Sequence, residues 1–421
     1  MHQTLYVIPH SFLDGWLLYA WLIIGAIIFG VLCYRNGIGK EATGFLPIYL
    51  IIAAVIYWIV PQLEVAGYDG KPAGMAIRGY GVFMLLGIVS GVSIALIRCH
   101  RVGINTDQVL TMLFWTVVVG LIGARLFYVI QKFDSFSGLP PREFVAGVLD
   151  MTKGGLVVYG SLIGGVLAAT IYIWRTRLPA LRVADAIAPG MVLGLALGRI
   201  GCLMNGCCFG GICDPELPNI QFPPGSPPYM QQLSDGELLG IEGELENEET
   251  RSLLVQSVTP GSPAETLGIK KDDRVSISVP DSLTVRAVKE EGLEVDDGVL
   301  IGSDRAGVLR LPISDFPDRS LGVHPTQIYS SANAFLLCLV LWFYFPFRKS
   351  DGEVFAVMLI LYAIGRFLLE SIRTDELGIW GTPFTISQCI SFLIFALGVM
   401  AFIYFRSRGK KFEVGALAPA R

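Results

Sequence analysis

The residues with the clearest chemical potential lie in one short stretch, residues 198–210, at the end of a long apolar segment. Arg199 stands inside that segment, and the chain that follows it is rich in glycine and cysteine. An arginine inside a hydrophobic segment is costly unless it faces a polar cavity or an anion. A guanidinium suits phosphate because its forked donors match the phosphate oxygens. The stretch therefore predicts an anion site where the apolar segment ends.

A second charged group lies near the end of another apolar segment. Arg366, Glu370 and Arg373 are spaced at i, i+4 and i+7, so they share one face of a helix. Two structural interpretations stay open: Glu370 could neutralise Arg366, and Arg373 could extend to a membrane interface. With Arg125 and Arg199 added, several arginines would need partners in one apolar body. A shared anionic ligand, such as a phosphate group, is the economical solution.

The elements that must position these residues are membrane helices. Of the 421 residues, 53% are hydrophobic and only 16% are charged, against about 25% charge in an average soluble chain. Each of the apolar segments approaches the ~20 residues that a helix needs to cross a bilayer. We expect about nine transmembrane helices in an all-α polytopic membrane protein, at residues 16–34, 45–60, 79–97, 109–130, 156–174, 183–203, 328–347, 354–372 and 386–405.

Basic residues between these segments predict an orientation. With nine spans they all fall on one side, which the positive-inside bias makes cytoplasmic. The N-terminus and the long loop after Leu203 are then outside, and the C-terminus is inside. The residues concerned are Arg35, Lys40, Arg98, Arg101, Arg175, Arg177, Arg182, Arg348, Lys349, Arg406, Arg408, Lys410 and Lys411.

The long loop is the one sizeable polar region. Residues 231–320 hold 19 acidic and 9 basic side chains, so the rest of a chain of net charge −4 is basic. Short apolar stretches alternate with Gly, Pro and Asp over residues 238–312, which predicts a small β-rich extracytoplasmic domain. Residues 253–275 resemble a PDZ domain in their order of strand, turn, short helix and strand. Such a domain could bind a peptide by strand addition, or it could serve only as a spacer.

Four cysteines open this loop: Cys202, Cys207, Cys208 and Cys213. A zinc site is conceivable, but the spacing is irregular compared with paired Cys-x2-4-Cys ligands. A disulfide from Cys207 or Cys208 to Cys213 fits a location outside the cytoplasm better. A catalytic thiol is the third interpretation. We therefore expect structural roles for these cysteines and no metal site.

The stretch at 198–210 resembles the motif of prolipoprotein diacylglyceryl transferases, through Gly-Arg-Ile-Gly, Asn205 and Gly210. Further resemblances follow in family order: residues 77–81 with Tyr80, 120–126 with Arg125, 155–165 with Tyr159 and Gly160, 324–329 with His324, Gln327 and Tyr329, and 365–373 with Arg366, Glu370 and Arg373. Two departures stand out. Cys202 and Cys207 occupy places where many members have Asn and Glu, and Tyr159 stands where many carry a His.

The resemblance implies transfer of the diacylglyceryl group of phosphatidylglycerol to the thiol of a prolipoprotein cysteine, with release of glycerol phosphate. We expect Arg199 and Arg366 to neutralise the phosphate leaving group, with Arg125 or Arg373 in support. Tyr159 would orient a head group, and Glu370 would hold Arg366 or Arg373. The catalytic set is thus Arg199, Arg366, Tyr159 and Glu370, and the substrate-binding set is Tyr80, Arg125, Gly160, Asn205, Gly210, His324, Gln327, Tyr329 and Arg373.

The predicted organisation follows from these placements. Residues 1–74 form an extra helical hairpin, 75–211 and 323–406 the two parts of the membrane core, 212–322 the insert and 407–421 a basic tail. The implied partners are phosphatidylglycerol, prolipoprotein signal peptides, the lipid bilayer of a bacterial cytoplasmic (inner) membrane and a peptide ligand of the insert. No cofactor and no nucleic acid are implied. The rival hypotheses are a catalytically altered receptor or scaffold whose insert binds peptides and, less favoured, a transporter.

Overall fold

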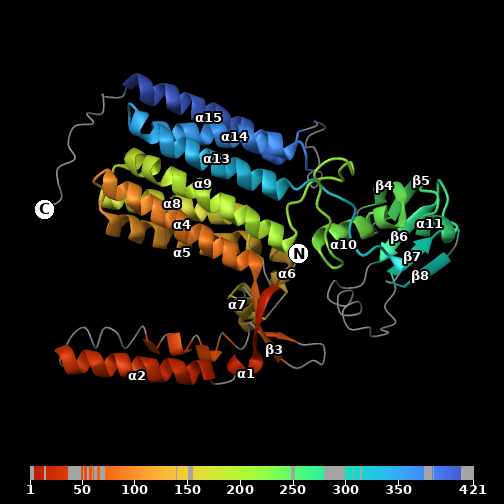
Figure 1. Ribbon diagram of the computed structural model, residues 1–421, viewed down its shortest axis with the longest axis horizontal. Helices are drawn as coiled ribbons and strands as arrows, with labels where there is room; N and C mark the ends of the chain where they lie inside the picture. Colours follow the sequence, from red (N-terminus) through yellow and green to blue (C-terminus); the bar gives the residue numbers. More distant parts are fainter. Residues whose placement is uncertain are drawn as a thin grey trace. The chain divides into compact units, whose positions relative to one another are not determined.

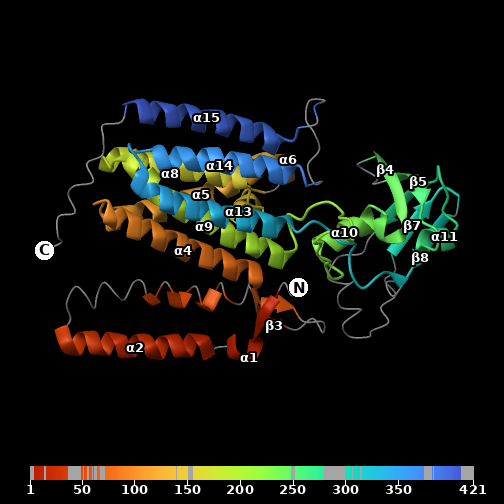
Figure 2. The ribbon, with the colours of Figure 1, turned by 45° about the horizontal axis from the view of Figure 1, so that its top comes forward.

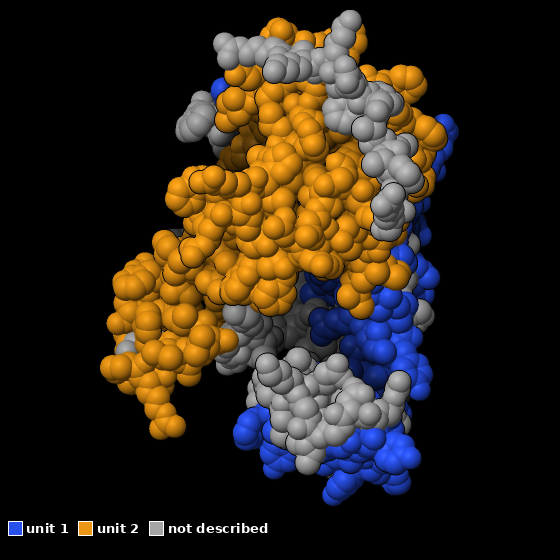
Figure 3. Space-filling view, turned by 90° about the vertical axis from the view of Figure 1, so that its left-hand side faces the viewer, with its two compact units in different colours: residues 1–84, 198–331, 368–385 blue, residues 85–197, 332–367, 386–421 orange. Residues whose placement is uncertain are grey.

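The computed structural model describes residues 4–13, 16–36, 49–50, 52–54, 56–58, 60, 64–66, 72–138, 140–149, 155–247, 252–278, 299–305, 307–312, 315–373, 382 and 384–408. The chain divides into two compact units (Figure 3). The first unit comprises Met1–Met84, Gly198–Ser331 and Leu368–Thr385, and the second comprises Leu85–Leu197, Ala332–Phe367 and Ile386–Arg421.

The second unit is built from long apolar helices. Figures 1 and 2 both show them side by side: α4 (Gly79–Arg101), α5 (Thr106–Gln131), α8 (Val158–Thr176), α9 (Ala180–Asn205), α13 (Thr326–Tyr344), α14 (Glu353–Glu370) and α15 (Ile386–Arg408). The ends of α4, α9, α13 and α14 belong to the first unit. Two short helices, α6 (Phe133–Ser137) and α7 (Pro141–Leu149), follow α5.

Glycine lets some of these helices approach closely. A Cβ placed on Gly160 of α8 would collide with the carbonyl oxygen of Gly123 on α5, and the converse also holds. Gly91 on α4 and Gly190 on α9 stand in the same reciprocal relation. Small residues that bring helix backbones together are typical of packing in membranes, where dispersion forces replace the hydrophobic effect.

Six helices of the described chain are long and apolar enough to cross a membrane: Gly79–Arg101, Thr106–Gln131, Val158–Thr176, Ala180–Asn205, Thr326–Phe347 and Ile386–Ser407. They coincide with six of the segments predicted from the sequence, so the expectation of a mainly helical, multi-pass chain is confirmed. The predicted segment at 354–372 is also a helix, α14, but it carries Glu353, Arg366 and Glu370. The segment at 16–34 is the helix α2 (Trp16–Asn36) of the first unit. That at 45–60 lies mostly outside the described residues, so the count of nine is not confirmed.

One buried carboxylate organises the start of α14. Asp185 lies on α9 and is 0% exposed. It accepts hydrogen bonds from the backbone N–H groups of Gly352, at 2.8 Å, and Phe355, at 2.9 Å. The guanidinium of Arg348 lies 3.8 Å away. A carboxylate at a helix N-terminus satisfies donors that have no intrahelical partner. Asp185, which lowers the hydrophobicity of the 183–203 segment, therefore caps another helix, α14.

We expect Asp185→Asn to destabilise the protein by about 3 kcal/mol, because it leaves the Arg348 guanidinium buried without its full counter-charge. In asparagine an NH2 group replaces one of the two carboxylate oxygens, and it cannot accept a hydrogen bond from a backbone N–H. Thermal unfolding in detergent measures the effect. Asp351→Asn is the matched control, because Asp351 contacts the same arginine but its side chain is 26% exposed. If both variants unfold at the same temperature, the importance of the buried cap is refuted.

The first unit contains two antiparallel sheets. The smaller has the order β1-β3-β2, from β1 (Thr4–Pro9), β2 (Glu64–Ala66) and β3 (Pro72–Arg78). The sequence did not predict this sheet, because its apolar segments indicated a helical hairpin over residues 1–74. The pairing of β1 with β3 joins strands more than 50 residues apart in the chain, with Thr4 opposite Arg78.

The larger sheet belongs to the insert and has the order β4-β5-β6-β7-β8 (Figure 1). Its strands are β4 (Ile241–Asn247), β5 (Ser252–Val258), β6 (Arg274–Ser278), β7 (Val299–Ser303) and β8 (Gly307–Leu311), with the helices α10 (Pro227–Ser234) and α11 (Pro263–Thr266). Leu239, Ile241, Val275, Val299 and Ile301 form its core and are at most 1% exposed. The expected strands are thus present. The resemblance to a PDZ domain stays a prediction, and residues 279–298 lie outside the described chain.

The insert carries a pH-sensitive carboxyl group. Glu237, on the 3-10 helix η2 (Glu237–Leu239), is partly buried, which together with the nearby Asp235 raises its pKa to about 7. The folded insert therefore binds a proton more tightly than the unfolded chain does. Its stability should fall as pH rises from about 4.5 through about 7, by at most about 3 kcal/mol.

Glu237→Gln should remove this pH dependence and leave the insert more stable at pH 8 than the unmodified chain. Hydrogen exchange of β5 and β6 in the whole protein, corrected for the intrinsic rate at each pH, measures it. Glu246→Gln is the control, since Glu246 is exposed and Arg274 lowers its pKa. The Glu246→Gln variant should still lose stability between pH 5 and pH 8, as the unmodified chain does. An unchanged slope in Glu237→Gln would refute the assignment.

Candidate active site

The predicted anion site begins on the last turns of α9. Arg199 and Cys202 lie on this helix, and the chain reverses at Gly206, whose φ of +76° favours glycine. The N–H of Cys207 then donates to the carbonyl oxygen of Cys202 at 3.1 Å. Cys208 also has a left-handed backbone, with φ of +59°. For a residue with a side chain this conformation is uncommon, and such residues gather at functional sites.

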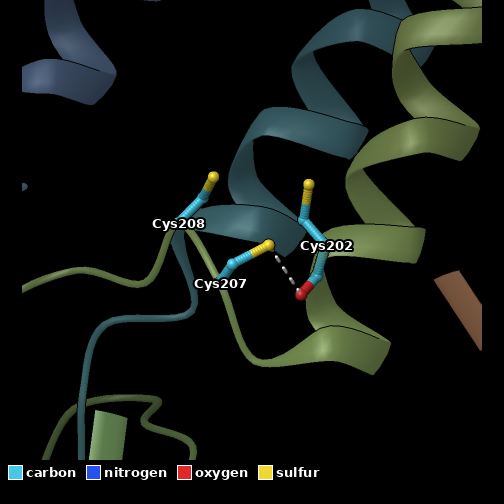
Figure 4. Close-up of side chains that lie close together, drawn as sticks. All are labelled: Cys202, Cys207 and Cys208. Atoms are coloured by element: carbon cyan, nitrogen blue, oxygen red, sulfur yellow. Dashed lines mark hydrogen bonds between the residues drawn. The ribbon is translucent and has the colours of Figure 1, made fainter. Parts of the chain in front are cut away.

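Three of the four cysteines come together here. The sulfur atoms of Cys202, Cys207 and Cys208 all lie within 4.8 Å of one another, and each residue is half-buried. Figure 4 shows the three side chains converging from the end of α9 and the loop after it. The side chain of Asn205 lies close enough to the Cys207 thiol to interact with it. We call these three residues the thiol cluster.

A distant segment holds this loop in place. The backbone of His324 exchanges two hydrogen bonds with the loop, donating to the carbonyl of Gly211 at 3.0 Å and accepting from Gly210 at 3.1 Å. Thr326 Oγ1 donates to the carbonyl oxygen of Cys208 at 2.7 Å, and Gln327 Nε2 donates to that of Cys207 at 2.9 Å. The structure therefore brings together two of the motifs that were singled out separately in the sequence.

Glycine is required at position 210 for this contact. A Cβ there would lie 2.7 Å from His324 Cβ and 2.8 Å from Thr326 Cγ2. On α9 itself, Gly201 faces Tyr80, because a Cβ on Gly201 would lie 3.2 Å from the Tyr80 carbonyl oxygen. Tyr80 itself is 39% exposed. Of the sequence-predicted residues, His324 and Gln327 thus contact the loop that contains Gly210, and Tyr80 packs against the last turns of α9, which end at Asn205.

Arg199 is close to the thiol cluster and has unused hydrogen-bonding capacity. Its Nε is buried and has no hydrogen-bond partner within the part of the chain that the structure describes. The neighbouring thiols of Cys202 and Cys207, with the positive charges of Arg199 and Arg373, lower the pKa of the Cys208 thiol below its ordinary value. A buried donor without a partner is costly. This cationic environment suits an anionic ligand.

Residues 370–373 adjoin the same loop. The N–H of Gly211 donates to the carbonyl oxygen of Ile372 at 3.2 Å. Glu370 is only 2% exposed, and Thr385 Oγ1 donates to its Oε1 at 3.4 Å. Sequence reasoning missed Thr385. The expectation that Glu370 holds Arg366 or Arg373 stays a prediction, and so does a substrate contact of the half-buried Tyr329.

The remaining predicted residues belong to the second unit. Arg125 is buried and donates to the carbonyl oxygens of Val148, Gly155 and Gly147 at 2.9, 3.0 and 2.7 Å. These bonds hold Gly147, Val148 and Gly155 against α5, a role that the sequence motifs did not suggest.

On the neighbouring helix α8, Tyr159 is 49% exposed, and Gly160 packs against Gly123 of α5. Arg366 Nη2 donates to Ser387 Oγ at 3.0 Å. The substrate roles of these residues stay predictions.

The disulfide predicted for Cys213 is wrong in this structure, where all eight cysteines are free. Cys213 lies beyond the bridge between Gly211 and His324, and its N–H donates to the Gly322 carbonyl oxygen at 2.9 Å. Its buried thiol donates to the carbonyl of Asp214 instead. The bridge separates Cys213 from the thiol cluster, although the sequence places it only five residues after Cys208.

This fold and site define a class of protein. It is a multi-pass membrane protein with an arginine and the thiol cluster at the end of one helix. The family model described as prolipoprotein diacylglyceryl transferase matches residues 72–404. The chain belongs to that family, as the sequence motifs predicted.

Similar proteins carry the name phosphatidylglycerol–prolipoprotein diacylglyceryl transferase. The one from Rhodopirellula baltica is 35% identical over 97% of this chain and 90% of its own length. The one from Clostridioides difficile is 25% identical over 80% of this chain and 94% of its own length. A third, from Deinococcus radiodurans, is 36% identical over 31% of this chain and 38% of its own length.

Proposed function

We propose that this chain transfers the diacylglyceryl group of phosphatidylglycerol to the cysteine thiol of prolipoproteins, the first step of bacterial lipoprotein maturation. The observation that carries the proposal is Arg199: its buried Nε has no hydrogen-bond partner in the described chain, and it stands beside the loop held by Thr326 and Gln327. A phosphate group would satisfy such a donor and its charge.

The reaction assigns a task to each part of the site. The substrate cysteine loses its thiol proton to water, and its sulfur attacks the glyceryl carbon that carries the phosphate oxygen. The carbon–oxygen bond breaks, and glycerol phosphate leaves with the electron pair and takes up a proton from water. Arg199 would stabilise the charge that develops on the leaving phosphate. We predict that Arg366, Arg125 or Arg373 helps Arg199 at the phosphate. We also predict that Tyr159 contacts the head group and that Glu370 holds one of the arginines in position.

The test uses the purified whole protein in phosphatidylglycerol nanodiscs with a synthetic peptide that carries a lipoprotein cysteine motif. The peptide should gain the mass of one diacylglyceryl group, and glycerol phosphate should appear in equal amount. A peptide with Ser in place of the Cys and nanodiscs of phosphatidylethanolamine are the controls. Peptide binding without any mass gain would reject the enzyme in favour of the receptor or scaffold.

For the topology we propose nine membrane spans in the bacterial cytoplasmic membrane, with the N-terminus and insert outside and the C-terminus inside. The basic residues at one end of the second unit's helices support this orientation, among them Arg98, Arg175, Arg348 and Arg406. Reporter fusions at the C-terminus and within the insert test it. A periplasm-active reporter that works at the C-terminus would contradict the orientation.

For the insert we propose a peptide partner that adds a strand to β4. This strand is at the edge of its sheet and carries exposed acidic residues, including Glu242 and Glu244. An exposed strand edge offers unpaired backbone groups. Deletion of residues 231–320 should then weaken transfer to whole prolipoproteins and spare transfer to a short peptide. Equal losses for both substrates would reject recruitment by the insert.

A further inference from the structure

The thiol cluster has the composition and nearly the spacing of a metal site. Zinc takes thiolate ligands at about 2.3 Å, which places tetrahedral sulfurs about 3.8 Å apart. The sulfurs of Cys202, Cys207 and Cys208 lie within 4.8 Å of one another and form no disulfide. Side-chain rotations that move each sulfur by less than about 1 Å would therefore bring all three onto one ion.

The backbone around the cluster is already fixed. The side chains of Gln327 and Thr326 donate hydrogen bonds to the carbonyl oxygens of Cys207 and Cys208, respectively. The N–H of Cys207 donates to the carbonyl oxygen of Cys202. The left-handed backbone of Cys208 lets two consecutive residues direct their sulfurs to one place. The side chain of Asn205 lies beside the Cys207 thiol, where it can make the type of outer contact that orients metal ligands.

The charges nearby favour an anionic metal centre. Three thiolates and one Zn²⁺ carry a net charge of −1, and a fourth thiolate would make it −2. Arg199 and Arg373 lie close enough to act electrostatically on Cys208. They would compensate this negative charge in a half-buried place where water cannot do so fully.

We propose that Cys202, Cys207 and Cys208 bind one zinc ion and leave its fourth position open for the thiolate of the substrate cysteine. Three protein ligands with an open position are typical of catalytic zinc, whereas structural zinc sites are closed by four. The inference rests on the transferase function proposed above. It departs from the expectation of no metal, because that expectation relied on sequence spacing alone.

Zinc would promote the deprotonation of the substrate thiol, a step for which the sequence offers no convincing general base. Transfer requires the substrate thiolate, and Tyr159 is a poor base at neutral pH because a tyrosine pKa is ordinarily about 10. A thiol that coordinates zinc loses its proton outright. The open position would thus both hold the substrate cysteine and activate it.

The step balances without any oxidant or reductant. The substrate thiol releases its proton to water as its sulfur binds zinc. The sulfur then forms a bond to the glyceryl carbon while the carbon–oxygen bond to phosphate breaks, and the oxygen keeps the electron pair. The released glycerol phosphate takes up a proton from water. The product is a neutral thioether, a weaker ligand than a thiolate, so it leaves the zinc and frees the position.

Metal analysis of the purified whole protein, prepared with a reductant and dialysed against zinc, tests the site. We expect about one zinc per chain and at least a tenfold weaker affinity in each of Cys202→Ser, Cys207→Ser and Cys208→Ser. Cys213→Ser is the matched control from the same loop, and it should keep its zinc. Cobalt in place of zinc should give the absorption of a tetrahedral thiolate complex. Addition of the cysteine peptide, but not the serine peptide, should shift that absorption.

The outcomes separate this inference from the proposed function. Full transfer by chelated protein with less than a tenth of a zinc per chain would overturn the metal site and leave the transferase standing. A disulfide between two cluster cysteines in protein purified without reductant, still fully active, would overturn it too. A cobalt spectrum that responds to the cysteine peptide, with no transfer from phosphatidylglycerol, would keep the site and reject the function.

Discussion

Replacing Arg199 with alanine is expected to lower kcat/KM for diacylglyceryl transfer by at least about 100-fold. Removal of one preorganised donor to a developing oxyanion lowers the rate by ~10²–10³, and the alanine substitution would also remove a full positive charge from the site. Its Nε is already buried and without a partner in the described chain, so the site holds the donor ready before the substrate arrives. Mass spectrometry of the peptide at several phosphatidylglycerol concentrations gives kcat and KM separately.

Two further variants sharpen this prediction. Arg199→Lys keeps the charge but not the planar fork, so we expect a smaller loss, on the order of tenfold. Arg319→Ala removes an exposed arginine of the same unit and should leave transfer unchanged. If Arg199→Ala kept a third or more of the normal activity, its role at the phosphate would have to be abandoned.

The parts of the fold that the sequence predicts are those fixed by local chemistry. The apolar segment at 183–203 is the helix Ala180–Asn205, and the segment at 386–405 is Ile386–Arg408. A membrane requires a helix to satisfy its own backbone groups, so hydrophobicity along the chain is nearly sufficient to locate it. The order of the short motifs likewise identified the family without any knowledge of the fold.

The parts that the sequence could not predict depend on distant contacts. Cys202 and Cys213 are at similar distances from Cys208 in the chain, yet only Cys202 faces it, because His324 bridges to Gly211 in between. The small sheet joins Thr4 to Arg78 although the helix α2 lies between them in the chain, and no local pattern marks that pairing. Arg125 likewise seemed to need an anion, whereas the structure provides backbone carbonyls.

The contacts of Arg125 predict the second large effect, a loss of stability. Replacing Arg125 with alanine should lower the free energy of unfolding by about 3 kcal/mol or more, because buried carbonyl groups would lose a charged donor. Its guanidinium donates to Gly147, Val148 and Gly155 and lies over the ring of Tyr128, with 5.1 Å from the guanidinium carbon to the ring centroid. Thermal unfolding in detergent measures the loss. Arg142→Ala, which removes an exposed arginine on the nearby α7, should change the unfolding temperature little.

Arg125→Lys separates this structural role from the predicted support of the phosphate. A lysine keeps the positive charge, but its single ammonium group cannot replace the three directed bonds of a guanidinium. If Arg125 acts only on the carbonyl groups of Gly147, Val148 and Gly155, the lysine variant should lose most of the stability that the alanine variant loses. Its KM for phosphatidylglycerol, measured well below the unfolding temperature, should then be unchanged. A raised KM in a variant of normal stability would instead place Arg125 at the phosphate, as the family resemblance of residues 120–126 implies.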